Sequence, residues 1–502
     1  MEAETVMGMS KEEFNRAAAM WGIALCVFAA ASGWVFMRFG QAWSIADLPQ
    51  SDFVNQIVPA YVVTEIAFIP VGAKLVDKYG CKPMLMIGAA VYLLASMMCL
   101  ISVSVEMLVV FRFLQGIGGG LILGMAFTSV GKIYAPDMRG KANELMTATF
   151  AIGSLFSTAM GYWFTDTFNW RAGFVFFSAL MLIGMVLAWI MLPKEEKTDA
   201  HIDIPAMVIA VLVFGSAAMY TQMVNLDFAL FSLKSGAFVA LIIVLVALLV
   251  YRSYHCDGST MPTHTTRFQK THIVLMFMFS LCGLGLIQYF FKLYLTYYEF
   301  DIYRASLMFL CMLGGAAITS MVGGRLVFKT GARPWIVGGS SLVVIGLLFT
   351  HQMADQGIFQ FGLSLFVFGI GLGCIVTEIL CSYQSVMPHK DIGPHTGNLM
   401  AVRMIGILSG NALIGAYISN VIDKGRTLAV IDVGSGNPLA SLSDTIAEGL
   451  DYVANTLDAG FLTTTIILAM IIAVLTAIAH AMGRDDVESL EAYREESGKK
   501  EE

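Results

Sequence analysis

Three ionisable side chains lie deep within long apolar stretches of the sequence: Glu65, Arg112 and Glu378. A charge in hydrocarbon is costly, so such residues usually face a protein interior and serve a function. Burial favours the neutral form of a carboxyl group, which makes Glu65 and Glu378 candidates for carrying a proton. Tyr61, one helical turn before Glu65, is expected in the same cavity. The alternatives are that both acids are merely hydrogen-bonded and that Arg112 caps carbonyls of the first helix.

Two further cations, Arg38 and Lys292, fall near the outer ends of apolar stretches in different halves of the chain. Aromatic side chains accompany them, among them Trp34 and Tyr289. Two buried cations facing one cavity favour an anionic substrate, and an aromatic lining suits an amphipathic ligand. The alternative is that both cations reach the membrane surface within an interfacial belt of aromatic residues.

The sequence lacks the residue patterns of an enzyme or a metal site. It has no nucleophile–base set and no Cys or His spacing of zinc ligands, so we predict no catalysis, no metal and no cofactor. His255, His264 and His272 lie in or beside one expected loop and are predicted to be solvated. The net charge of −7 and the lack of a basic block predict no nucleic-acid partner.

The composition predicts helices that span a lipid bilayer. Hydrophobic residues make up 57% of the 502 residues and charged residues 13%, against about 25% charge in soluble domains. A spanning helix needs about 20 apolar residues, and these stretches are too continuously apolar for a barrel. We predict fourteen helices, at approximately 18–37, 53–73, 84–104, 107–131, 143–164, 172–192, 205–224, 232–251, 272–292, 305–327, 335–351, 358–380, 397–420 and 460–482.

The basic residues predict the orientation of these helices. With both termini inside, 21 Lys and Arg fall in inner segments and 5 in outer loops. Basic residues prefer short cytoplasmic loops, so we predict a multi-pass protein of the cell (inner) membrane with both termini cytoplasmic. The bias indicates an even number of spans, which twelve helices would also satisfy.

The chain contains an internal repeat. Residues 73–83 read A-K-L-V-D-K-Y-G-C-K-P and residues 324–334 read G-R-L-V-F-K-T-G-A-R-P, an offset of 251. A second pair, G-I-G-G-G at 116–120 and G-I-G-L-G at 369–373, has an offset of 253. Such self-similarity predicts two related six-helix bundles, with two extra helices inserted between them. The predicted units are an N-terminal bundle, a linker with the inserted helices, and a C-terminal bundle with a cytoplasmic tail: 1–193, 194–256 and 257–502.

Two of these segments resemble motifs of the major facilitator superfamily. Residues 73–82 are similar to the family's loop 2–3 signature, G-x-L-x-D-R-x-G-R-R, with Asp77, Lys78 and Gly80 at matching places. The stretch R-F-L-Q-G, which begins at Arg112, resembles the R-x-x-Q-G of the family's helix 4. The resemblance implies the major facilitator fold, a latch on the cytoplasmic side formed by Asp77 and its neighbours, and a proton-coupling role for Arg112. The alternative for the latch is that these charges only set topology.

Weaker matches indicate the fourteen-helix drug:proton antiporter branch of that family. N-W-R at 169–171 resembles the W-R that opens helix 6, and H-I-D-I-P at 201–205 resembles the D-x-x-G that opens helix 7. Two departures disfavour antiport of cationic drugs. Helix 5 reads G-S-L-F-S-T-A-M-G-Y from Gly153, where the branch has G-x-x-x-G-P-x-x-G-G, and helix 1 has Arg38 where the branch has an acid.

Arg403, in the stretch G-N-L-M-A-V-R-M-I-G, resembles the arginine of the family's helix 13. We place it in the substrate cavity and expect it to pair with Glu378.

Together these features predict a secondary active transporter that works by alternating access. We expect proton-coupled efflux of a small amphipathic organic compound, with an anion or a zwitterion favoured. The alternatives are proton-coupled uptake of an organic anion and a transporter-like membrane sensor without flux. A long outer loop at 421–458 either contacts an envelope partner or covers the outer vestibule.

Overall fold

A computed structural model describes the chain at residues 5–6, 9–49, 51–134, 136–193, 201–224, 232–256, 267–281, 302–353, 357–385 and 392–433. Lys292, Tyr289 and the helix predicted at 460–482 lie outside these residues.

The described chain is built almost entirely of helices, and nine of its helical segments are long and apolar enough to cross a membrane. The all-helical membrane fold is therefore confirmed, while the total of fourteen spans stays a prediction. Two two-residue strands, β1 (Thr5–Val6) and β2 (Met9–Ser10), and a short 3-10 helix, η1 (Val54–Gln56), complete the described elements. The helices are α1 (Lys11–Asp47), α2 (Ile57–Tyr79), α3 (Cys81–Leu100), α4 (Val105–Ile133), α5 (Pro136–Thr167), α6 (Trp170–Met191), α7 (Ile204–Met223), α8 (Leu233–His255), α9 (Arg267–Phe279), α11 (Ile302–Thr330), α12 (Arg333–Met353), α13 (Ile358–Ser385) and α14 (Ile392–Val433).

Short polar caps start several of these helices where the sequence leaves the apolar runs. The side chains of Ser104, Asn169, Asp203 and Ser232 each accept a hydrogen bond from a backbone N–H in the first turn of α4, α6, α7 and α8. Such caps satisfy donors that a helix cannot pair internally. The sequence therefore sets the points at which the chain reverses.

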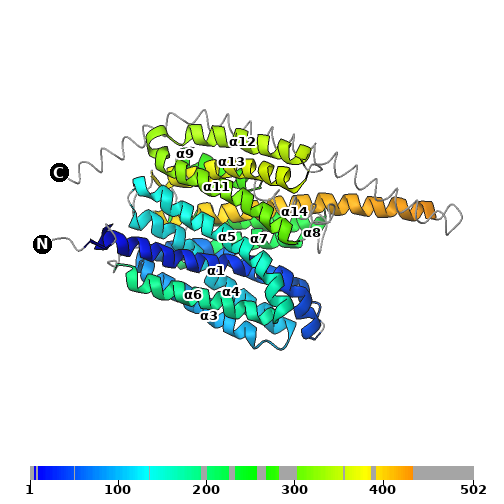
Figure 1. Ribbon diagram of the computed structural model, residues 1–502. Coiled ribbons are helices and arrows are strands. Elements are labelled where there is room, and N and C mark those ends of the chain that lie inside the picture. The colour runs from blue at the N-terminus through cyan, green and yellow to red at the C-terminus, as the bar shows by residue number, and fades with distance from the viewer. Residues whose placement is uncertain are drawn as a thin grey trace.

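The helices form two groups that lie side by side in Figure 1. In the first half, α2 packs on α4, α1 packs on α5 and α6, and α3 packs on α4 and α6. In the second half, α11 and α12 pack on α13, and α9 packs on α14. The halves meet where α5 packs on α11 and α2 packs on α14. Successive helices alternate in direction, so Asp77 and Arg171 mark opposite ends of the bundle, here called the Asp77 end and the Arg171 end.

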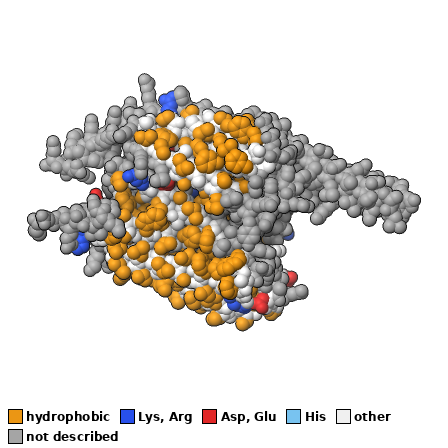
Figure 2. Space-filling model, in the orientation of Figure 1, with side chains coloured by type: hydrophobic (Ala, Val, Ile, Leu, Met, Phe, Trp, Pro, Cys, Tyr) orange, Lys and Arg blue, Asp and Glu red, His pale blue; other side chains and the backbone are white. Residues whose placement is uncertain are grey.

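The sides of the bundle are hydrophobic. Figure 2 shows a broad apolar surface over the helices, with charged side chains toward its margins. Leu94, Ile190 and Ile243 are among the outward-facing side chains, each exposed over more than 60% of its surface. Contiguous apolar surface of this extent fits a hydrocarbon environment.

The internal repeat is present in the backbone as well as in the sequence. Gly80, between α2 and α3, has φ of 83°, and Gly331, at the offset of 251, has φ of 76°. Only glycine adopts this conformation readily. The two halves also share a helix-to-helix hydrogen bond: Thr64 donates to Phe113 O at 2.9 Å, and Thr319 donates to Ile370 O at 3.0 Å.

The inserted helices α7 and α8 form a hairpin at the side of the bundle. α7 packs on α2 and α14, one helix from each half, while α8 packs on α7. At the Asp77 end, Arg252 of α8 donates from Nε and Nη2 to Asp203 at 2.9 Å each. The hydrogen bonds from Arg252 hold the pKa of Asp203 below its ordinary value. The pair thus ties the first turn of α7 to the last turn of α8.

One predicted loop is wrong in part. The segment 421–458 is expected to be an outer loop, but α14 continues as far as Val433. The first residues of that segment are therefore helical, and those after 433 lie outside the described residues. The physical reason is that residues 421–433 contain no proline and one glycine, so nothing in them stops a helix already under way.

Candidate functional site

Arg112 is fully buried in the first half and has its guanidinium satisfied by neighbouring helices. Nη2 donates to Gly33 O of α1 at 2.6 Å, and Nη1 donates to Gln115 Oε1 at 2.7 Å. Gln115 in turn donates to Ser96 Oγ of α3 at 2.7 Å. The guanidinium carbon also lies 4.3 Å from the centre of the Tyr61 ring, a favourable cation–π position. The arginine therefore caps a carbonyl of α1, as the structural alternative expected, and joins three helices.

Tyr61 connects this arginine to Glu65. Its hydroxyl lies 2.7 Å from Ala30 O and 3.0 Å from Glu65 Oε1. A phenol carries one proton, so both contacts are hydrogen bonds at once only when Glu65 supplies a proton of its own. Glu65 is fully buried and its Oε2 has no partner. The geometry is thus suited to a carboxyl group that holds and releases a proton.

Glu378 of α13 is the buried acid of the second half, and neither of its oxygens has a hydrogen-bond partner. Its carboxylate lies against Gly323 of α11, where any side chain would collide with it, near Trp335 of α12. The predicted ion pair with Arg403 is wrong, because no ion pair of the described residues joins the two. The acid points toward α11, whereas Arg403 lines a cavity elsewhere on α13 and α14.

That cavity of about 280 Å³ lies between the two halves. It is lined by α5 of the first half and by α11, α13 and α14 of the second. Arg403 is only 4% exposed, and its Nε and Nη1 have no partner. The lining residues are Glu144, Thr147, Ala148, Ala151, Ile152, Leu310, Met312, Leu313, Gly314, Ala316, Ala317, Leu372, Gly373, Val376, Thr377 and Arg403.

Asp77 lies where α2 of the first half meets α14 of the second. Lys132 of α4 places its Nζ 2.9 Å from Asp77 Oδ1, so the charge partner is Lys132 and not the adjacent Lys78. A Cβ atom at Gly393, in the first turn of α14, would be 2.6 Å from Asp77 Oδ2. The carboxylate therefore also faces a helix N-terminus, where negative charge is favoured.

Sequence reasoning missed the polar residues that join the halves beside Asp77. Arg139 of α5 donates from Nη1 to Gln384 O of α13 at 2.8 Å. Asn143, one turn later, donates to Gln384 Oε1 at 2.8 Å, and Gln384 donates to Thr396 Oγ1 of α14 at 3.2 Å. Arg139 and Asn143 stand four residues apart, on one helix face, and that spacing was the available signal.

One histidine prediction is also wrong. His272 is 1% exposed, not solvated, and its Nε2 lies 2.6 Å from Ser382 Oγ of α13. The cause is that α9 begins at Arg267, five residues before the predicted helix, so His272 falls inside the packed helix. His395 of α14 is buried in the same region, with Nδ1 3.0 Å from the Tyr383 hydroxyl.

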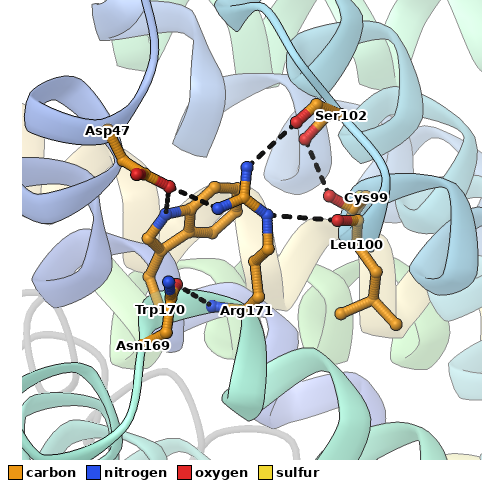
Figure 3. A network of polar contacts seen from close by, with 7 residues as sticks. All are labelled: Asp47, Cys99, Leu100, Ser102, Asn169, Trp170 and Arg171. Atoms are coloured by element: carbon orange, nitrogen blue, oxygen red, sulfur yellow. Dashed lines mark hydrogen bonds and ion pairs between the residues drawn. The ribbon is translucent and has the colours of Figure 1, made fainter.

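The Arg171 end of the first half is tied by a separate network, drawn in Figure 3. Asp47, at the end of α1, pairs with Arg171 and accepts a hydrogen bond from the Trp170 indole at 3.1 Å. Arg171 also donates to Leu100 O at 3.1 Å and to Ser102 O at 3.0 Å. The hydrogen bonds that Asp47 accepts, first from Arg171 and then from Trp170, hold the pKa of Asp47 below its ordinary value.

The remaining predicted cavity residues are only partly placed. Trp34 is buried on α1 and meets Phe150 of α5 edge to face, with ring centres 5.9 Å apart. Arg38 lies on α1, but its side chain is outside the described atoms, as are Lys292 and Tyr289 entirely. Within the described residues, no three His, Cys, Asp or Glu side chains stand close enough together to hold a metal ion.

A sequence model described as "Major Facilitator Superfamily" matches residues 23–411. The chain belongs to the major facilitator superfamily. The facilitator chain is 23% identical to the multidrug transporter protein MdtP of Bacillus subtilis (strain 168), over 82% of its own length and 77% of MdtP. It is 25% identical to the multidrug resistance protein Stp of Mycobacterium tuberculosis (strain CDC 1551 / Oshkosh), over 78% of its length and 74% of Stp.

Solved structures confirm the major facilitator fold. The human organic anion transporter MFSD10 (TETRAN) matches with a TM-score of 0.56 and 13% identity, over 92% of this chain and 100% of that one. The proton:xylose symporter XylE matches with a TM-score of 0.56 and 12% identity, over 88% and 95% of the two chains. Membership of this family, shown by the sequence model over residues 23–411, makes the chain a multi-pass transporter of small molecules and not an enzyme.

Proposed function

We propose that this facilitator exports small amphipathic organic compounds across the cell (inner) membrane, driven by a proton gradient, with both termini cytoplasmic. The observation that carries the proposal is the chain Arg112–Tyr61–Glu65, which places a carboxyl group able to exchange a proton beside a fixed cation. The names of the relatives MdtP and Stp, a multidrug transporter and a multidrug resistance protein, support the outward direction.

The two halves would rock against each other to expose the cavity to each side in turn. The contacts at the Asp77 end would then form the cytoplasmic gate. Asp77 would hold the gate through Lys132 and the N-terminus of α14, and Gly80 would keep the α2–α3 turn tight enough to place it. Lys78 would contribute only to the positive charge of that side. The hydrogen bond from Arg139 to Gln384, which joins the halves beside Asp77, supports a closed state of the proposed gate.

The proton would be carried at Glu65, with Glu378 as a second carrier. When Glu65 is neutral, its own proton completes the contact to Tyr61. When it is ionised, it competes with Ala30 O for the phenol proton and feels the positive charge of Arg112. Loss of the proton would therefore pull on α1, α2 and α4 together, and this links the protonation state to the packing of the first half.

A pH jump on proteoliposomes tests the proposal. An imposed proton gradient should drive accumulation of a transported compound, and Glu65→Gln should reduce this by at least about tenfold, with substrate exchange at equal pH retained. Glu12→Gln, an exposed residue on α1, is the matched control and should leave both activities unchanged. Unchanged gradient-driven transport in both Glu65→Gln and Glu378→Gln would remove these acids from the mechanism.

A second candidate is uptake of an organic anion by proton symport. It is favoured by Arg403, which lines the cavity and whose Nε and Nη1 have no partner, and by the name of MFSD10, an organic anion transporter. Counterflow of a labelled compound with the gradient inverted separates the two directions. Accumulation on the acidic side supports export, and accumulation on the alkaline side supports symport.

A further inference from the structure

The cavity between the halves contains polar atoms that the protein itself leaves without partners. Arg403 and Thr147 line the cavity, and three of their atoms, Arg403 Nε and Nη1 and Thr147 Oγ1, are buried without a hydrogen-bond partner. Leaving a buried donor unpaired is unfavourable, and more so when the donor is charged. These atoms come from different halves, Thr147 from α5 and Arg403 from α14, so a ligand that satisfied both would bridge the halves.

The guanidinium selects the chemistry of that ligand. Arginine offers five N–H donors in a planar fork and no acceptor, and it is matched best by a carboxylate or a similar planar anion. The protein supplies no such partner, because Glu378 is turned toward Gly323 and no ion pair of the described residues includes Arg403. A bound anion would remove the cost of the buried charge.

The rest of the lining limits the size and the total charge of the ligand. Small apolar side chains of α5 and α11, such as Ala148, Ala151 and Ala317, leave room for a compact hydrophobic body. The volume of about 280 Å³ is at the small end of ligand pockets, which run from about 300 to 1,000 Å³. Glu144 lines the same cavity, and its carboxylate would repel a second negative group on the ligand.

We propose that this cavity binds a compact organic monoanion, with its carboxylate on Arg403 and its apolar body against α5 and α11. The assignment rests on the proposed transport function and names the substrate class for the same site. Thr147 would donate to or accept from a polar atom of the bound compound. The selectivity is for one negative charge: neutral compounds leave the arginine unpaired, and dianions meet Glu144.

Isothermal titration of the full chain in nanodiscs with three probes built on one naphthalene ring tests the assignment. The probes are 1-naphthoate, 1-naphthamide and 1,4-naphthalenedicarboxylate, which carry one, no and two negative charges. 1-Naphthoate should bind at least about tenfold more tightly than either of the others, since charge-assisted bonds to a guanidinium exceed neutral ones. Equal binding of the amide, tighter binding of the dianion, or no saturable binding of naphthoate at millimolar concentration would overturn the proposal.

Variants locate the site. Arg403→Met should abolish the preference for naphthoate over naphthamide, and Arg403→Lys should retain part of it. Thr147→Val should weaken naphthoate about threefold to tenfold, while the matched control Thr128→Val should have no effect. Thr128 Oγ1 is likewise buried without a partner, but Thr128 does not line the cavity. A preference that survives in Arg403→Met places the anion elsewhere and overturns the assignment.

The outcome distinguishes this proposal from the proposed function. Binding of naphthoate that depends on Arg403, without gradient-driven movement of naphthoate in proteoliposomes, would uphold the anion site and count against proton-coupled export. Gradient-driven export of a neutral or cationic compound, without any binding of naphthoate, would uphold proton-coupled export and overturn the anion site.

Discussion

The two halves of the facilitator share one backbone plan but treat buried charge in opposite ways. In the first half, Arg112 is bonded to α1 and to Gln115, and it lies over Tyr61. In the second half, Arg403 and Glu378 are as deeply buried, yet the nitrogens Nε and Nη1 of the one and both oxygens of the other lack partners. A charge that is satisfied holds helices together, whereas an unsatisfied one is available to a ligand or a proton. The buried arginine of the first half therefore holds helices together, whereas the buried arginine of the second half is available to a ligand.

The largest expected effect separates the two buried arginines. Arg112→Met leaves Gly33 O and Gln115 unpaired in the interior and should lower the free energy of unfolding by about 3–5 kcal/mol. Arg403→Met removes a buried charge whose Nε and Nη1 are shielded from solvent and have no protein partner. The substitution should leave the free energy of unfolding unchanged or raise it by about 1–4 kcal/mol. Chemical denaturation of the reconstituted protein measures both. Equal destabilisation by the two substitutions would break the comparison, since Arg403 would then be as structural as Arg112.

The next effect tests the contact through which the halves meet. A Cβ atom at Gly397 of α14 would be 2.5 Å from Ala73 Cβ of α2, so Gly397→Leu should prevent closure at the Asp77 end. Cys381 is fully buried at this interface, 3.8 Å from Asn143 Nδ2, and it serves as a native reporter. In a variant with Cys381 as the sole cysteine, Gly397→Leu should raise its rate of maleimide labelling about fivefold or more.

Gly338→Leu is the matched control for that experiment. A Cβ atom at Gly338, on α12 of the second half, would have nothing within 4 Å. This substitution should leave the labelling of Cys381 unchanged. If both variants increased labelling alike, the increase would reflect general loosening of the second half and not an opened gate.

The smallest effect concerns the inserted hairpin, which belongs to neither half. Asp203→Asn keeps the helix cap but removes the charge partner of Arg252, and it should lower the unfolding temperature at pH 7 by less than about 3 °C. The folded-state pKa of Asp203 is below its ordinary value of 3.8. The ion pair therefore contributes its full stabilisation at pH values above 3.8. This stabilisation is lost as the pH falls through the lower pKa that Asp203 has in the folded state. The difference between wild type and Asp203→Asn should shrink accordingly in acid, while the binding preference of the cavity stays unchanged at pH 7.

The backbone plan was predictable from the sequence, because it depends on signals that act locally. Apolar length gave the helices, and Gly80 and Gly331 marked the repeated turn that the structure shows in the same conformation. The cost of burying a charge likewise identified Arg112 and Glu65 as interior groups. What the sequence could not give is which way a buried side chain turns when several helices surround it. Glu378 points toward α11 and not toward Arg403 because Gly323 leaves room there, and that choice depends on packing between distant segments.

The contacts between the halves were missed for the same reason. Arg139 falls among loop charges whose number predicts orientation, and its four-residue spacing from Asn143 does not say which distant segment the two side chains will meet. Only the approach of α13, about 245 residues away in sequence, turns it into a bridge. The extent of α14 was misjudged because composition identifies the part of a helix that lies in lipid and says little about how far it continues beyond.

That long helix has a mechanical consequence. α14 carries Gly393 and Gly397 against α2 and, less than two turns later, Arg403 in the cavity. Six residues of helix span about 9 Å, so the gate contact and the anion anchor sit on one stiff rod. A bound compound that draws Arg403 toward α5 would tilt α14, and the same tilt would move the first turns of α14 against α2. The C-terminal part of α14, which runs on to Val433 (Figure 1), would move furthest, and a pair of fluorophores could follow its displacement.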